Sequence, residues 1–128
     1  MSGWAGLQHL LWGDDLMNLP EDGSLLRIFI GESDRCEGKP LYEWLVVKAR
    51  ESGLAGATVL RGMIGFGPSS KISSHKILRL SEDLPIVIEI VDRQEKLENF
   101  LDQINGVIQE GLVTIESARI KIYRGRKE

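Results

Sequence analysis

The sequence predicts an α+β domain of the ferredoxin-like plan, in which two helices cover one face of a four-stranded antiparallel sheet. The first observation is the order of the runs: strand, helix, two strands, helix and strand, the split βαβ arrangement βαββαβ. The second is length, since 128 residues suffice for one domain with a sizeable core. The third is composition, because 42% hydrophobic and 27% charged residues are typical of an ordinary globular domain.

The first half of the domain is predicted to hold two strands and a helix. The apolar, β-rich run at residues 25–30 predicts the first strand. A helix is expected between Pro40, which suits a first helical turn, and Gly53, which suits a C-terminal cap. Residues 57–61 predict the second strand, and a glycine- and serine-rich loop is expected over residues 62–76.

The second half begins with a short strand predicted at residues 77–80. The run at residues 86–91 is apolar on both faces, which places it in the centre of the sheet. Asp92 with Glu95 three residues later is the pattern of a capping box, and it predicts the start of the second helix. Apolar residues at helical spacing continue this helix over residues 97–104.

The final strand is predicted at residues 113–123. Three of its residues are expected in the core: Ile115, Ile120 and Ile122. Because both helices lie on one face, the opposite face, which includes Val87 and Val91, would be left uncovered in a single chain. A large exposed apolar patch is unfavourable in water, so we expect a homo-oligomer.

Residues 1–23 differ in composition from the predicted domain, which we place at residues 24–128. They combine acidic, turn-rich stretches with apolar residues partly at helical spacing. These apolar residues are Trp4, Leu7, Leu10, Leu11 and Trp12. Two interpretations stay open: a short amphipathic segment that docks on the domain or on a neighbouring subunit, and a flexible tail.

Composition argues against several kinds of protein. One cysteine and two histidines leave no internal disulfide and little basis for a metal site. A net charge of −3 argues against a nucleic-acid binder. No apolar run approaches the ~20 residues of a membrane span, and the N-terminal stretch lacks the features of a signal peptide. We therefore expect a cytoplasmic protein that requires no metal or other cofactor.

The glycine-rich loop is the strongest candidate for an anion site. No acidic residue occurs from Ser52 through Ser81, whereas four cations do: Arg61, Lys71, Lys76 and Arg79. Glycine lets backbone N–H groups approach a phosphate, and lysine or arginine supplies countercharge. The loop matches neither the dinucleotide-binding nor the P-loop motif. The alternative is a solvated surface loop whose charges only keep it soluble.

Basic residues also gather near the C-terminal end. Arg119, Lys121 and Tyr123 share one face of a strand by period two. They could form a second cationic wall of the anion site, from the same or an adjacent subunit, or protect an edge strand against pairing. Glu89 in the central strand must face solvent, a subunit cleft or a cationic partner.

Two single residues have alternative interpretations. His75 could serve as a general base, but a solvent-facing histidine in a polar loop is the simpler interpretation. Arg35 and Lys39 near Cys36 favour a lowered thiol pKa, whereas the acidic neighbours, among them Glu37, favour an ordinary thiol.

The sequence resembles the PII-like family catalogued as domain of unknown function 190, which is related to nitrogen regulatory PII signalling proteins. The resemblance spans about residues 24–124. It is carried by Ile30–Asp34, Gly38–Tyr42, Gly53–Gly62, Gly65–Gly67, Leu78–Pro85 and Val91–Asp92. It implies a PII-like ferredoxin fold that forms a homotrimer. Lys76 departs from the threonine expected at that position of the family.

The resemblance also implies binding of an adenine nucleotide, AMP, ADP or ATP, in clefts between subunits. In PII proteins a Gly-Phe-Gly segment lies at the base of a mobile loop after the second strand. The nucleotide-binding residues expected here are Gly65, Phe66, Gly67, Ser70, Lys71, Arg61, Glu89, Arg119 and Lys121. The expected effector loop comprises Pro68, Ser69, Ile72, Ser73, Ser74, His75 and Lys76. This loop would engage a partner, such as a membrane transporter or channel.

Three functions follow from these interpretations. The favoured one is a non-catalytic regulatory trimer, in which a ligand shifts the population of loop conformations. The second is a small phosphate-ester or acyl-phosphate hydrolase on the same fold, with Arg27 as a phosphate clamp, although no glycine-rich cradle follows the first strand. The third is a structural or metal-responsive trimer.

Overall fold

The computed structural model describes residues 19–68, 73–74 and 83–126. Along the chain the elements are β1 (Asp22–Gly31), β2 (Arg35–Cys36), β3 (Lys39–Pro40), α3 (Leu41–Glu51), β4 (Thr58–Arg61), β5 (Ile64–Gly65), β6 (Ser73–Ser74), β7 (Pro85–Asp92), α4 (Gln94–Ile104), a 3-10 turn (Asn105–Val107) and β8 (Leu112–Arg119). The predicted short strand at residues 77–80 lies outside the described residues, as do residues 1–18.

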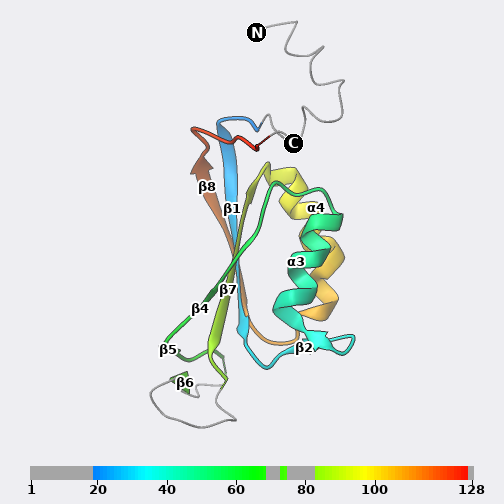
Figure 1. Ribbon diagram of the computed structural model, residues 1–128, viewed down its shortest axis with the longest axis vertical. Coiled ribbons are helices and arrows are strands. Elements are labelled where there is room, and N and C mark those ends of the chain that lie inside the picture. Colours follow the sequence, from blue (N-terminus) through cyan, green and yellow to red (C-terminus); the bar gives the residue numbers. More distant parts are fainter. Residues whose placement is uncertain (1–18, 69–72, 75–82, 127–128) are drawn as a thin grey trace, which may run out of the picture.

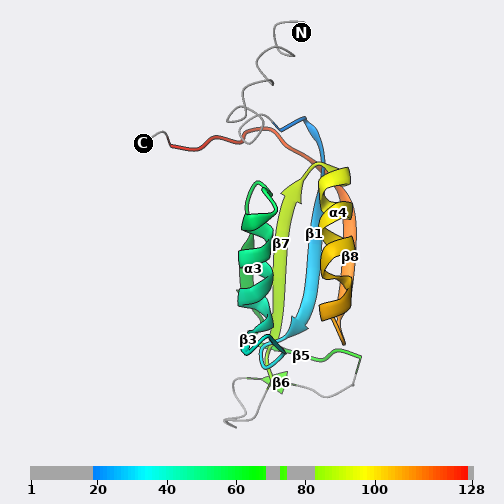
Figure 2. The same ribbon diagram turned by 90° about the vertical axis from the view of Figure 1, so that its right-hand side faces the viewer.

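The four long strands form one antiparallel sheet in the order β4-β7-β1-β8. The helices α3 and α4 run side by side on one face of this sheet and leave the other face open (Figures 1 and 2). This confirms the ferredoxin-like βαββαβ prediction. The strand predicted at residues 86–91 is β7, and it occupies a central position as expected.

The core lies between the two helices and the sheet face that they cover. Every second side chain of β1 and β7 is buried, as the two-residue period of a strand requires. The buried core residues are Leu26, Ile28, Ile30, Leu41, Leu45, Ala49, Leu54, Ile86, Ile88, Ile90, Leu97, Phe100 and Ile104. Burial of one large apolar side chain contributes about 1.5–3 kcal/mol, so this layer is the main source of stability.

The predicted capping box at the start of α4 is wrong. The residue that precedes the helix is Arg93, and no side chain caps it. Asp92 is instead the last residue of β7 and is fully buried. Its carboxylate accepts hydrogen bonds from the backbone N–H groups of Ala55 and Arg93. It therefore does not cap the N–H groups in the first turn of α4.

The predicted last strand is too long. It ends at Arg119 rather than at residue 123, because the chain then leaves β8 and crosses the end of the sheet (Figure 2). Ile115 packs against the core and Ile120 is half-buried, but Ile122 is 70% exposed. The prediction of Ile122 as a core residue is wrong, since the period of a strand no longer applies to the crossing segment.

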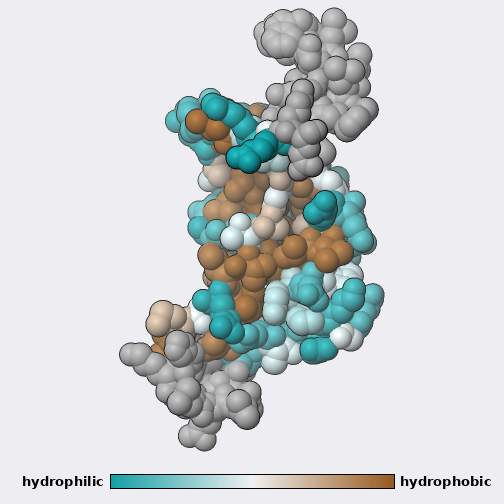
Figure 3. Space-filling view, viewed as in Figure 1, coloured by the Kyte–Doolittle hydropathy of each residue, from teal (hydrophilic) through white to brown (hydrophobic). Residues whose placement is uncertain are grey.

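The predicted glycine-rich loop contains a short hairpin. Ile64 and Gly65 of β5 pair with Ser74 and Ser73 of β6. Apolar side chains beside this hairpin are open to solvent: Leu60, Met63, Ile64 and Phe66 are 49–70% exposed. Figure 3 shows a band of apolar residues across the middle of this side of the molecule and a second apolar group at the end that carries β5.

No helix in the described part of the chain is long and apolar enough to span a bilayer.

Candidate functional site

The open face of the sheet has an ionic centre. By strand register, Arg27 of β1 lies opposite Glu89 of β7 on one side and Thr114 of β8 on the other. The Arg27 Nε donates to Glu89 at 2.9 Å, and its guanidinium also pairs with Glu116. Hydrogen bonding to Glu89, followed by the contribution of Glu116, holds the pKa of Arg27 above its ordinary value. Glu89 therefore has the cationic partner that its central position requires.

This ionic centre also bears on the hydrolase alternative. A phosphate clamp needs a guanidinium whose donors are available to the ligand. Arg27 already binds two carboxylates, which a phosphate would have to displace. Apolar side chains of the same face surround it, including the half-buried Phe29 and Val87 and the exposed Leu112.

A pocket of about 550 Å³ opens on this face where β1 begins and β8 ends. Its volume lies within the range of small-molecule sites. Three residues predicted to bind nucleotide line it together: Glu89, Arg119 and Lys121. The remaining lining residues are Leu19, Leu25, Ala55, Gly56, Ala57, Thr58, Val91, Ala118, Ile120, Ile122 and Tyr123.

Glu21 neutralises part of the positive charge at this pocket. Its Oε2 accepts from Arg119 Nε at 3.0 Å and from Lys121 Nζ at 3.2 Å. Hydrogen bonds from Arg119 first, and then Lys121, hold the pKa of Glu21 below its ordinary value. Two cations share this one carboxylate, so these three side chains together carry one excess positive charge. Glu21 was not predicted from the sequence, because only the pairing of β1 with β8, which sets the adjacent Asp22 opposite Arg119, brings it to these cations.

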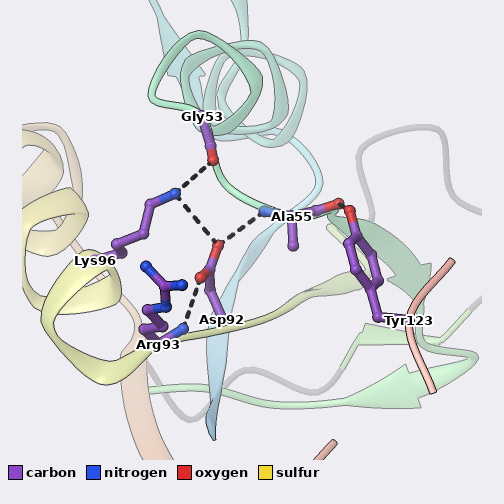
Figure 4. A network of polar contacts seen from close by, with 6 residues as sticks. All are labelled: Gly53, Ala55, Asp92, Arg93, Lys96 and Tyr123. Atoms are coloured by element: carbon purple, nitrogen blue, oxygen red, sulfur yellow. Dashed lines mark hydrogen bonds and ion pairs between the residues drawn. The ribbon is translucent and has the colours of Figure 1, made fainter. Parts of the chain in front are cut away.

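A network of polar contacts braces one wall of the pocket (Figure 4). Asp92 Oδ2 accepts from the backbone N–H of Ala55 at 2.9 Å, and Oδ1 accepts from that of Arg93 at 2.6 Å. Lys96 Nζ donates to the carbonyl of Gly53 at 2.8 Å. The Tyr123 hydroxyl donates to the carbonyl of Ala55 at 2.7 Å. Ala55 thus joins the buried carboxylate to the crossing C-terminal segment.

The glycine-rich half of the predicted site lies at the other end of the sheet. Arg61 Nη1 pairs with Glu32 at 2.7 Å, and the N–H of Gly62 donates to the Pro85 carbonyl at 2.7 Å. Phe66 is 70% exposed, and Gly67 has open space around its Cα. Arg61, which has no acidic neighbour in the sequence, therefore has a carboxylate partner in Glu32, the residue that follows β1.

Six of the predicted site residues belong to segments that the structure does not describe. Ser69, Ser70, Lys71, Ile72, His75 and Lys76 lie outside the described residues. Of the effector loop, Pro68 is exposed, and the backbone of Ser73 and Ser74 forms β6.

One chain does not bring the two halves of the predicted site together. By strand register, Asp22 lies opposite Arg119 at one end of β1, and Gly31 lies opposite Pro85 at the other end. Nine residue steps of strand separate these ends, which amounts to about 30 Å. A single small molecule cannot contact both ends within one chain.

The cysteine shows no sign of activation. Burial, with a smaller effect from Glu37, raises the pKa of the Cys36 thiol above its ordinary value. The alternative in which Arg35 and Lys39 lower the pKa of this thiol is therefore wrong, because desolvation dominates. Within the described ranges, no group of three or more His, Cys, Asp or Glu side chains is arranged to hold a metal ion.

Comparison with solved structures identifies the class of fold. The chain is similar to the structure of CPII, a nitrogen regulatory PII-like protein from Thiomonas intermedia K12, bound to ADP, AMP and bicarbonate. The TM-score is 0.60 at 17% identity, over 77% of this chain and 88% of that chain. The fold is thus that of the PII-like ferredoxin-fold proteins.

Sequence comparison identifies the family within this class. The model of family DUF190, described as "Uncharacterized ACR, COG1993", matches residues 23–120, and the chain belongs to this family. A UPF0166 protein of Aquifex aeolicus is 45% identical over 75% of this chain and 90% of the relative. A UPF0166 protein of Methanocaldococcus jannaschii is 33% identical over 79% of this chain and 92% of the relative.

Proposed function

We propose that the protein is a cytoplasmic, non-catalytic regulatory trimer that binds an adenine nucleotide between its subunits. The observation that carries this proposal is the division of the charged residues between two ends of the sheet. Arg61 and the Gly65–Gly67 segment lie at one end, and the Arg119–Lys121 pair lies at the other. A cleft between two chains can combine one end of each.

The open sheet face supports association of identical chains. It carries apolar side chains around the Arg27 ion pairs, and Leu60 and Leu112 are about half exposed. In a closed ring of three subunits, each interface joins two different surfaces. Each cleft can therefore receive the glycine-rich end of one chain and the basic C-terminal end of its neighbour.

The chemistry of the two ends suits a nucleotide. Glycines allow backbone N–H groups to approach phosphates, and the cations supply countercharge. The solved PII-like protein bound to ADP and AMP supports this choice of ligand. The ligand would favour one conformation of the loop that includes Pro68 to Lys76, and this loop would present itself to a partner protein such as a membrane transporter or channel.

Calorimetric titration with AMP, ADP and ATP tests the proposal, together with measurement of the mass of the assembly in solution. We expect a trimer and binding of at least one nucleotide. The double variant Arg119→Ala/Lys121→Ala should lose about tenfold or more in affinity, since each charge-assisted hydrogen bond contributes about 1.5–3 kcal/mol. Arg124→Ala, a nearby exposed cation outside the pocket, is the matched control. A monomer, or absence of binding in the folded protein, refutes the proposal.

Mixing two defective variants tests whether the site lies between subunits. Arg61→Ala damages the glycine-rich end and Arg119→Ala the basic end. If the two are unfolded together and refolded as mixed trimers, each cleft has a one-half chance of an intact surface from each side. About one quarter of the clefts should then bind with wild-type affinity. A site within one chain would give none, and that outcome would contradict the shared cleft.

A further inference from the structure

The pocket beside the end of β8 lies where residues 1–18 join the domain. Leu19, the first described residue, lines this pocket, and Glu21 contacts two of its cations two residues later. The family model starts only at residue 23. Residues 1–18 therefore precede the family domain, and they join it at Leu19, which lines the pocket.

The chemistry of these residues complements the lining. The pocket presents the aliphatic side chains of Leu19, Leu25, Val91, Ile120 and Ile122, the last of them 70% exposed. Residues 4–12 carry two tryptophans and three leucines. Burial of one aromatic side chain removes about 150–250 Å² from water, which provides a driving force for contact with such a lining.

The charges and the length of the chain also favour contact between this N-terminal segment and the pocket. Arg119 and Lys121 share the single carboxylate of Glu21, which leaves one positive charge in excess. Asp14 and Asp15 lie five and four positions before Leu19, respectively. Seven residue steps separate Trp12 from Leu19, and an extended chain of that length reaches about 24 Å. This is sufficient to cross the pocket.

We propose that residues 4–15 dock in this pocket of their own chain and compete there with the anionic ligand. The tryptophans and leucines cover the aliphatic lining, and Asp14 and Asp15 approach the Arg119–Lys121 pair. The extension then acts as a built-in competitor that a ligand must displace. The competition rests on the proposed function, but the docking of the segment does not.

Tryptophan fluorescence tests the docking without any ligand. The chain has three tryptophans, so Trp44→Phe leaves only Trp4 and Trp12, both in the extension. We expect the emission of this variant to be blue-shifted relative to a free peptide of residues 1–18. Adding Ile122→Asp in the pocket should abolish the shift. Val47→Asp, at an exposed position on α3 away from the pocket, is the matched control and should leave it.

A second measurement guards against misfolding of Trp44→Phe, because Trp44 packs against the core. The difference between the wild-type spectrum and that of Trp4→Phe/Trp12→Phe isolates the same signal. Emission equal to that of the free peptide in both measurements overturns the proposal. A shift that appears only at concentrations where chains associate would place the segment on a second copy, and this also overturns it.

Titration with ADP tests the competition. Protein lacking residues 1–18 should bind ADP at least about fivefold more tightly than the full chain, the lower range of coupling between two ligands. ADP should also shift the emission of Trp44→Phe toward that of the free peptide. Docking together with equal ADP affinity of both proteins overturns the competition. If neither protein binds ADP, the proposed function fails while the fluorescence result still decides the docking.

Discussion

Replacement of Asp92 by alanine is expected to lower the free energy of unfolding by about 3–6 kcal/mol. The carboxylate is fully buried and accepts two backbone hydrogen bonds, from Ala55 at 2.9 Å and Arg93 at 2.6 Å. A hydrogen bond to a charged group contributes about 1.5–3 kcal/mol, and the alanine variant loses both. Asp92→Asn keeps one acceptor oxygen, so we expect it to lose about half as much.

Equilibrium unfolding in urea measures these losses, with all proteins at one concentration because association also contributes to apparent stability. Asp102→Ala is the control, since it removes an exposed carboxylate from α4, the helix that follows Asp92. It should change the free energy of unfolding by less than about 0.5 kcal/mol. A loss below about 1 kcal/mol for Asp92→Ala would refute the reasoning that this carboxylate braces the segment at Ala55.

Three further predictions concern single residues. Gly111→Ala should cost about 1–3 kcal/mol in urea unfolding, because a Cβ there would press on the Phe29 carbonyl oxygen, whereas Gly106→Ala meets nothing within 4 Å and should be nearly neutral; equal effects would contradict this. The ion pairs of Glu21 lower its pKa in the folded state from 4.5, so wild type should be more stable than Glu21→Gln above pH 4.5. This stability difference should disappear as the pH falls through the folded-state pKa. A difference independent of pH and salt would be inconsistent with the ion pairs. Cys36 should react with a disulfide reagent at pH 8 more slowly than free cysteine, because its pKa is raised from 9.0, and an equal rate would show that burial does not protect the thiol.

Local patterns were sufficient to predict the fold. Apolar, β-rich runs marked β1 and β7, and apolar residues at helical spacing marked α4. The run of β7 is apolar on both faces, so the structure alone shows which of its faces the helices cover. Asp92 was misassigned because an aspartate between a strand and a helix has the sequence pattern of a cap. Only the approach of Ala55, 37 positions away, determines where its carboxylate binds.

The candidate site was harder to predict than the fold, because pairing of charges is a property of the tertiary structure. Composition identified the cations at residues 61, 119 and 121, but the carboxylates that hold them, Glu32 and Glu21, come from segments 29 and about 100 positions away. The crossing of the C-terminal segment, held by Tyr123, was likewise invisible in the sequence. It moves Ile122 to the surface and creates the wall of the pocket.

The position of β1 in the sheet has a consequence for synthesis of the chain. This strand is made first, yet both strands that flank it come from the second half: Arg27 meets a partner 62 positions later in β7 and another 89 positions later in β8. Contacts so distant in sequence form slowly. On the ribosome, the apolar run at residues 25–30 cannot pair with β7 and β8 until nearly the whole chain has been synthesised. It is therefore a segment that chaperones would recognise in a nascent chain.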